Sequence, residues 1–134
     1  MIFLDTSVIV AYQNTDDARH ADALKLFSEL EKGSYAGGLV TDYIVLETVT
    51  VVKRLMGHEA AVETGEALLG AGDITVMRST RLFPHAWREF RARAGTGLSF
   101  VDASSLAAMK LAGVNRIASF DREFRKVKGI EVMP

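Results

Sequence analysis

The sequence predicts an α/β fold in which helices cover both faces of a central, mainly parallel sheet. Short apolar segments alternate along the chain with longer segments of helical periodicity, as successive β–α–β units require. The apolar segments lack a two-residue alternation of polar and apolar side chains, which is typical of strands buried on both faces. At 134 residues, the chain can form one core, and we expect a single domain over residues 1–134.

The elements expected in the first half of the chain are separated by glycines. They are a strand at residues 2–4, a helix at 17–32, a strand at 38–40 and helices at 41–56 and 59–69. Gly33 and Gly57 follow two of these helices directly. Glycine adopts the left-handed backbone conformation that commonly ends a helix, so both boundaries are well defined.

The second half continues the alternation of strands and helices. The expected elements are a strand at residues 74–77, a helix ending near 94–95, a helix at 100–111, and strands at 117–120 and 130–133. Pro84 lies near the start of the first of these helices or bends it, because proline lacks a backbone N–H. Right-handed crossovers then make the strands parallel, with functional residues gathered at their carboxyl ends.

The composition excludes several classes of protein. There is no cysteine, which excludes a disulfide scaffold, a thiolate zinc site and a cysteine nucleophile, and is compatible with the reducing cytoplasm. The N-terminus has no basic segment before Asp5, so it does not resemble a signal peptide, and no apolar stretch is expected to span a membrane. Glycine-rich nucleotide-binding motifs and the G-x-S-x-G motif are absent, and the three histidines lack metal-ligand spacing.

Charge is distributed unevenly although the net charge is −1. Residues 1–77 carry 12 acidic and 5 basic side chains, whereas residues 78–134 carry 5 acidic and 11 basic ones. A basic half in a nearly neutral protein indicates a polyanionic partner. The alternative is that these side chains form ordinary solvated faces of helices.

Two aspartates follow predicted strands. Asp5 comes directly after the first strand, and Asp121 comes directly after the strand expected at 117–120. Because the carboxyl ends of parallel strands meet at one edge of the sheet, both side chains are candidates for a functional cluster. The structural alternative for each is a helix N-cap, a position that aspartate favours.

Two further acids are expected on helices. Asp102 lies on an inward-facing stripe of its helix, but Ser99 and Asp102 also match the spacing of a capping box. Glu47 lies at the rim of a broad apolar arc, where it either faces a cleft or forms an exposed pair with Arg54.

Taken together, the four acids predict a metal site. Two carboxylates ~4 Å apart repel by roughly 4 kcal/mol at an effective dielectric constant of 20, so a cluster needs a cation. Oxygen ligands without nearby histidine or cysteine favour a hard ion, Mg²⁺ or Mn²⁺.

The order and surroundings of these acids resemble the PIN-domain nucleases, and within them the VapC-type toxins of prokaryotic toxin–antitoxin pairs. The matching segments are 2–7 around Asp5, the helix around Glu47, 98–103 around Asp102 and 118–124 around Asp121. The resemblance implies a three-layer α/β/α sandwich and Mg²⁺- or Mn²⁺-dependent cleavage of single-stranded regions of RNA.

The resemblance also implies roles for particular residues. Asp5, Glu47 and Asp102 match the principal metal ligands, and Asp121 matches a residue that binds a second ion or positions water. Ser7 and Ser119 match hydroxyl positions that flank the first and fourth acids.

Two kinds of protein partner are implied as well. One is a cognate antitoxin, received by the region of the helices at 17–32 and 41–56, and the other is a second copy in a homodimer. The open alternatives are an RNA-processing nuclease without an antitoxin and a catalytically inactive PIN module that binds RNA or protein.

The basic half offers a candidate surface for RNA. Its members are Arg78, Arg81, Arg88, Arg91 and Arg93. Trp87 and Phe90 lie among them and could stack on bases, but aromatic residues in a helix more often pack in the core, and we expect that here.

Overall fold

The computed structural model describes all residues from 1 to 134 and contains a five-stranded sheet in the order β3-β2-β1-β4-β5. Every neighbouring pair of strands is parallel, which confirms the expected parallel sheet. The strands are β1 (Ile2–Leu4), β2 (Gly38–Thr41), β3 (Ile74–Met77), β4 (Arg116–Ala118) and β5 (Glu131–Met133). The central strand β1 pairs Phe3 with both Leu39 of β2 and Ile117 of β4, so it lies in the middle of the core.

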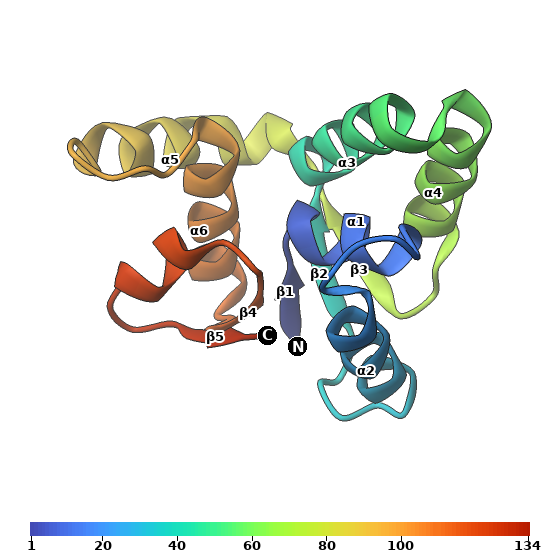
Figure 1. Ribbon diagram of the computed structural model, residues 1–134. Helices are drawn as coiled ribbons and strands as arrows, with labels where there is room; N and C mark the ends of the chain where they lie inside the picture. The colour runs from blue at the N-terminus through green and yellow to red at the C-terminus, as the bar shows by residue number, and fades with distance from the viewer.

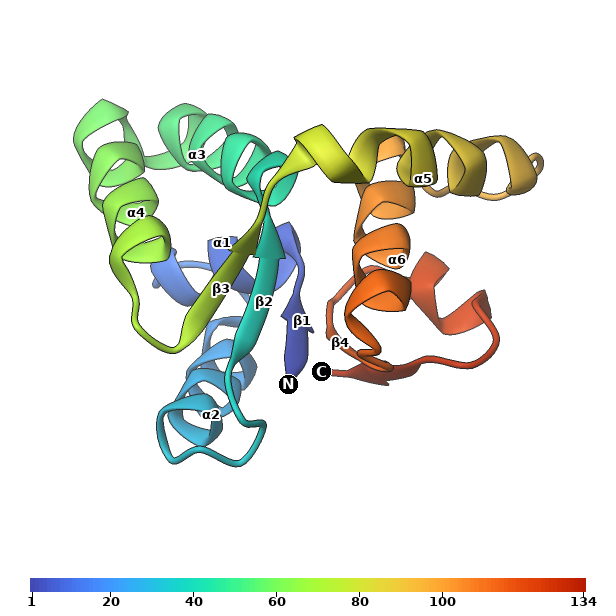
Figure 2. The ribbon, with the colours of Figure 1, turned by 180° about the vertical axis from the view of Figure 1, so that it is seen from behind.

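The connections place helices on both faces of the sheet. The helices are α1 (Thr6–Gln13), α2 (His20–Glu31), α3 (Asp42–Met56), α4 (His58–Gly70), α5 (Ser79–Ala92) and α6 (Phe100–Ala112), with a 3₁₀ helix η1 (Arg122–Lys126). The chain crosses from β1 to β3 in one direction and from β3 to β5 in the other, so right-handed crossovers use opposite faces. Figures 1 and 2 show α1 and α6 on opposite sides of β1, as the three-layer sandwich requires.

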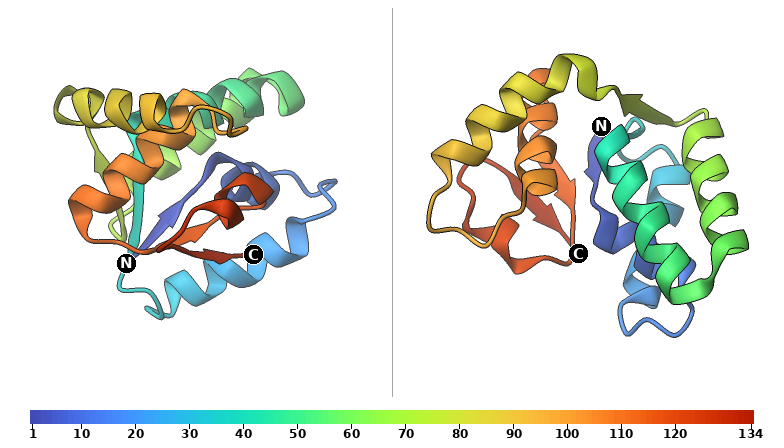
Figure 3. Two further views of the ribbon diagram at one scale, coloured as in Figure 1. Left: turned by 90° about the vertical axis from the view of Figure 1, so that its left-hand side faces the viewer. Right: turned by 90° about the horizontal axis from the view of Figure 1, so that it is seen from above.

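The carboxyl ends of the strands form the edge on which the site is built. Figure 1 shows α3 and α5 lying across the upper edge of the molecule, toward which β1 and β2 point. Figure 3 shows the same two helices from the side and from above, running away from each other over the sheet. None of the helices is long and apolar enough to cross a membrane.

Most element boundaries differ from the expected ones by one to three residues, and α1 and η1 were not among the expected elements, whereas Pro84 lies in its helix as expected. β4 ends at Ala118 rather than residue 120: the N–H of Ser119 still donates to Met133 O of β5, but the N–H of Phe120 donates to Ser7 Oγ in the site. α2 begins at His20 rather than residue 17, because Asp17 accepts the N–H of Arg19 in a turn. Pro84 lies inside α5, and Figure 2 shows the first turns of that helix set at an angle to the rest.

A glycine makes the tight packing of the central strands possible. A Cβ atom added to Gly38 in β2 would lie 3.0 Å from Leu4 Cδ1 and 3.4 Å from Ile74 Cγ1. Leu4 is fully buried, so its side chain has little room to retreat. The spacing of β2 from its neighbours therefore depends on the absence of a side chain at this position.

We expect Gly38→Ala to lower the free energy of unfolding by about 1–3 kcal/mol, because it overpacks the core between β1 and β3. The matched control is Gly70→Ala, since a Cβ there meets no atom within 4 Å. Alanine at this helical position should leave stability unchanged or raise it by up to about 1 kcal/mol. Urea unfolding measures both, and a Gly38→Ala variant as stable as wild type would contradict the packing described.

Candidate active site

Asp5 stands at the carboxyl end of the central strand and caps α1. Its backbone N–H donates to Ala118 O at 3.0 Å, which ties it to β4. Its Oδ2 accepts hydrogen bonds from Ser7 Oγ at 2.6 Å and Ser119 Oγ at 2.7 Å. No hydrogen bond engages Oδ1, so one oxygen of the carboxylate is held and the other is free.

The carboxyl group of Asp5 is in an environment that disfavours its charge. Only 4 % of the residue is exposed. Burial raises the pKa of Asp5 to about 6, and repulsion from Asp102 adds to this, while the hydroxyls of Ser7 and Ser119 oppose it. Asp102 is thus close enough to act on Asp5, and a cation between them would relieve both effects.

Glu47 is held close to Asp5 by a hydrogen bond from Thr6, the residue that follows Asp5 in the chain. It projects from the second turn of α3 and accepts a hydrogen bond from Thr6 Oγ1 at 2.5 Å. Because Thr6 follows Asp5 directly, this contact fixes the glutamate beside the end of β1. The alternative pair with Arg54 is not formed, since no ion pair joins them.

Asp102 fulfils two functions that the sequence presents as alternatives. It completes the capping box of α6, in which its Oδ2 accepts Ser99 N–H at 2.6 Å and its own N–H donates to Ser99 Oγ at 3.1 Å. It also lines the same cleft as Asp5. The capping box therefore orients a cleft carboxylate and does not remove it from the site.

Asp121 reaches the cleft through a short turn after β4. Its N–H donates to Ser119 Oγ at 3.0 Å, and its Oδ1 caps η1 by accepting Glu123 N–H at 2.9 Å. The expectation that it directly follows a strand is wrong, because β4 ends at Ala118. Ser119 contacts both aspartates and holds the turn against the end of β1.

All four acids line one open cleft of about 540 Å³. In Figure 1 the segments that carry them meet near the upper ends of β1 and β4. The sequence analysis missed three other polar residues of this cleft: Thr6, Asp17 and Arg19. Thr6 was detectable as the neighbour of Asp5, whereas Asp17 and Arg19 match no motif and were placed in the helix expected at 17–32, which begins only at His20.

The cleft offers only oxygen donors to a metal ion. Carboxylate and hydroxyl oxygens suit a hard divalent cation. The carboxylates of Asp5 and Asp102 repel each other, and neither forms an ion pair with a basic side chain. No three acidic or histidine side chains are closed around a common point as a ready-made metal cage. The donor chemistry of the cleft fits Mg²⁺ or Mn²⁺.

The arginines of the predicted RNA surface differ in availability. Arg78, Arg81, Arg88 and Arg91 are exposed, and no ion pair engages any of them. Arg93 is instead held by Glu89 at 3.1 Å and is half-buried.

The expectation that Trp87 and Phe90 pack in the core is wrong. They are 49 % and 40 % exposed, and both rings contact the ring of Phe100 at the start of α6. The buried face of α5 is formed instead by Leu82 and Ala86. The aromatic side chains therefore lie beside the exposed arginines.

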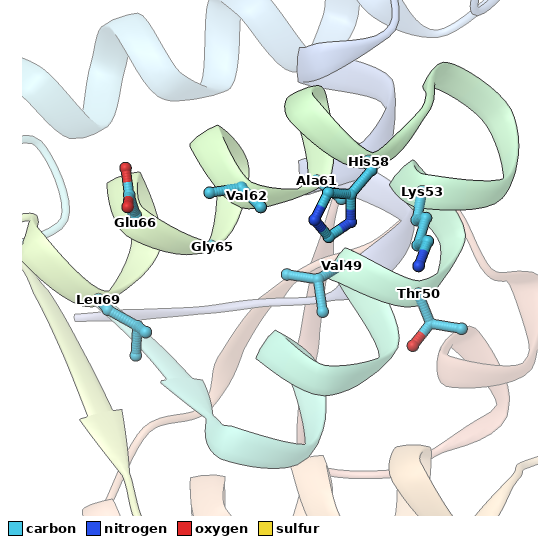
Figure 4. Close-up of a pocket in the computed structure, with 9 residues that line it drawn as sticks. All are labelled: Val49, Thr50, Lys53, His58, Ala61, Val62, Gly65, Glu66 and Leu69. Atoms are coloured by element: carbon cyan, nitrogen blue, oxygen red, sulfur yellow. The ribbon is translucent and has the colours of Figure 1, made fainter.

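A second cavity lies between α3 and α4, away from the acids. Figure 4 shows the side chains that line it, which are Val49, Thr50, Lys53, His58, Ala61, Val62, Gly65, Glu66 and Leu69. Its volume is about 360 Å³, and it contains a single carboxylate, that of Glu66. It has the character of a groove for an apolar side chain and not of a metal centre.

Comparisons with known proteins agree with this fold. The PIN domain family matches residues 2–130. A curated relative, the 23S rRNA-specific endonuclease VapC20 of Mycobacterium tuberculosis, is 33 % identical over 100 % of this chain and 99 % of its own length.

Solved structures show the same likeness. The crystal structure of Mycobacterium tuberculosis VapC20, described as a Sarcin-Ricin loop cleaving toxin, superposes with a TM-score of 0.88 at 30 % identity over the whole of both chains. A toxin–antitoxin complex from Klebsiella pneumoniae shares the fold alone, with a TM-score of 0.62 at 14 % identity over 98 % of this chain and 96 % of that one.

The chain belongs to the PIN-domain family. Within that family it is similar over its whole length to a VapC-type protein, which confirms the resemblance given by the segments around its four acids.

We expect Asp102→Asn to retain the capping box, because the amide oxygen can still accept Ser99 N–H. Loss of the charge removes repulsion from Asp5, so the metal-free variant should be as stable as wild type or more stable by up to about 1 kcal/mol. Its stabilisation by Mn²⁺ should shrink. Thermal melts with and without Mn²⁺ measure both effects, with the exposed Asp16→Asn as control. A variant that melts lower without metal and gains as much from Mn²⁺ as wild type would make Asp102 a cap alone.

Proposed function

We propose that the protein is a metal-dependent endoribonuclease that cleaves single-stranded regions of RNA and acts as the toxin of a toxin–antitoxin pair. The observation that carries this is the single cleft lined by Asp5, Glu47, Asp102 and Asp121. Membership of the PIN-domain family and the likeness to VapC20 support the same reaction class.

In this proposal Asp5, Glu47 and Asp102 are the principal ligands of Mg²⁺ or Mn²⁺, and Asp121 binds a second ion or positions water. Such an ion, when bound, orients a water molecule and lowers its pKa so that it can attack the phosphodiester. Ser7 and Ser119 hold one oxygen of Asp5 and leave the other for the metal. Thr6 does the same for Glu47.

The RNA substrate has two features that the surface can recognise. Its phosphates would contact the exposed arginines Arg78, Arg81, Arg88 and Arg91, while Arg93 contributes less because Glu89 holds it. Its unpaired bases would stack on Trp87 and Phe90. A ribosomal RNA loop is the substrate class that the name of VapC20 suggests.

Two protein partners complete the proposal. An antitoxin would dock on the region of α2 and α3, and the groove between α3 and α4, on the side of α3 away from the cleft, would accept its apolar side chains. A second copy of the chain would form a homodimer, and residues 1–134 would act as one nuclease unit in the cytoplasm. The fold of a solved toxin–antitoxin complex supports this partnership.

Two alternatives remain distinct from a toxin. An RNA-processing nuclease without an antitoxin would use the same cleft, and the neighbouring gene would separate it, since a toxin requires a short antitoxin frame beside it. An inactive PIN module would lack one of the acids, and all four are present.

We expect the protein to cleave a sarcin–ricin-loop hairpin RNA in Mn²⁺ or Mg²⁺ and to lose cleavage in excess EDTA, because the acids alone cannot activate water. Asp5→Asn should abolish cleavage and retain the fold, since the amide can still pair with Ser7 and Ser119. Gel analysis of the RNA and circular dichroism of the variant measure the two effects. Full cleavage in EDTA would exclude the metal-dependent mechanism.

We also expect RNA affinity to fall with salt, because the exposed arginines of α5 contact phosphates. For a single strand the slope of log K against log salt changes by about 0.7 per contact, so Arg88→Ala with Arg91→Ala should reduce it by about 1.4. The control replaces Lys25 and Arg54, exposed cations of the first half of the chain. Titrations on catalytically inactive protein give the slope, and equal slopes for both double variants would exclude the α5 surface.

A further inference from the structure

The cleft contains one basic side chain among its acids. Five carboxylates line it, those of Asp5, Asp17, Glu47, Asp102 and Asp121, and Arg19 is the sole lysine or arginine on its wall. An RNA backbone that enters such a cleft meets five carboxylates and a single positive charge, that of this residue. Arg19 is therefore the natural contact for a phosphate in the cleft.

One contact fixes the backbone of Arg19 and a second positions its guanidinium. Arg19 lies in the loop that joins α1 to α2 (Figure 1), where its backbone N–H donates to Asp17 Oδ1 at 2.7 Å. Its Cζ lies 4.4 Å from the centre of the Phe120 ring, in a cation–π contact. Stacking on a ring fixes the plane of a guanidinium and leaves its N–H groups at the edge available.

Phe120 connects this contact to the acids. Its N–H donates to Ser7 Oγ at 3.0 Å, and Ser7 in turn bonds Asp5. Phe120 also lies in the chain between Ser119 and Asp121, both of which take part in the site. The ring under Arg19 is thus positioned by the same hydrogen bonds that position the carboxylates.

The existing partners of Arg19 leave most of its hydrogen-bonding capacity free. Its one ion pair joins Nε to Asp22 Oδ2 at 3.3 Å, with both side chains about half exposed at 47 % and 45 %. Such an exposed pair contributes little to stability. No ion pair joins Arg19 to any of the four acids, and none uses its two Nη groups. The two Nη groups of Arg19 are therefore available to a ligand in the cleft.

We propose that Arg19, stacked on Phe120, is a substrate-binding residue that grips a backbone phosphate of the RNA next to the bond that is cut. The inference rests on the proposed ribonuclease function and assigns the cation of that site. A planar guanidinium with two free N–H groups matches the two oxygens of a phosphate, and the bond it makes is charge-assisted. It also offsets the repulsion that the remaining carboxylates exert on the substrate.

The test compares Arg19→Ala with Arg116→Ala. The two arginines are matched, since Arg116 is 48 % exposed and also forms one ion pair through Nε, with Glu131 at 3.0 Å. Arg116 lies at the start of β4, at the opposite end of the sheet from the cleft. Cleavage of the sarcin–ricin-loop hairpin in Mn²⁺ gives KM and kcat, and thermal melts with added Mn²⁺ report metal binding without RNA.

Arg19→Ala should raise KM for the hairpin by about 10- to 100-fold, as loss of a charge-assisted hydrogen bond predicts, while Arg116→Ala leaves it unchanged. Stabilisation by Mn²⁺ should stay at the wild-type value. Arg19→Lys should recover part of the loss, because a point charge replaces the planar fork. Phe120→Leu should raise KM in the same direction, since it removes the ring beneath the guanidinium.

A chemical change in the substrate identifies the phosphate itself. A neutral methylphosphonate placed at one position beside the mapped cleavage site should weaken wild-type binding and leave Arg19→Ala unaffected, because the contact is already absent. Equal sensitivity of both proteins at every position would overturn the inference. So would an Arg19→Ala variant whose KM equals that of Arg116→Ala, or one whose only defect is weaker Mn²⁺ stabilisation.

These outcomes are distinct from failure of the proposed function. If the wild-type protein does not cleave RNA in Mn²⁺, the ribonuclease proposal itself is wrong. If the wild type cleaves and Arg19→Ala cleaves with the same KM, the nuclease stands and the assignment of Arg19 falls.

Discussion

The carboxylate of Asp5 is buried at the carboxyl end of the central strand, where two serine hydroxyls hold its Oδ2. Burial of a charge without a counterion is unfavourable, so the surrounding chain must supply hydrogen bonds and access to a cation. Ser119 supplies one of those bonds and also fixes the turn that brings Asp121 into the cleft. Thr6, the next residue, fixes Glu47. The geometry of the cleft therefore follows from the position of one side chain.

Much of the fold was predictable from the sequence because its strands are apolar and its helices end at glycines. Gly57 ends α3 as expected, and the alternation of elements predicts the parallel sheet that is observed. The wrong boundaries have two kinds of cause. α2 begins late because of a local turn at Asp17, whereas β4 ends early because the N–H of Phe120 bonds Ser7, a residue 113 positions away. No local pattern reports a contact of that kind.

The four acids of the site were identified in the sequence by their order and their neighbours, and the structure brings them to one cleft. The place of Arg19 in the cleft could not be identified, because the residue lies in an irregular loop and its guanidinium is positioned by a ring at position 120. Asp102 shows a different difficulty, since a helix cap and a cleft carboxylate have the same sequence pattern. Trp87 and Phe90 were misjudged because helical periodicity gives the spacing of a face and not whether another element covers it.

The side chains of helix α3 face three different parts of the molecule. Ile44 packs in the core, Glu47 and Val51 face the cleft, and Val49 and Lys53 line the groove shared with α4. A helix used on three sides has few positions that can change without consequence, so its mutational tolerance is confined to exposed positions such as Leu46 and Arg54. A helix shifts as a rigid body, so a larger side chain substituted at the groove would move α3 and displace Glu47 with it. Variation on the groove side of α3 is in this way constrained by the carboxylate on its other side.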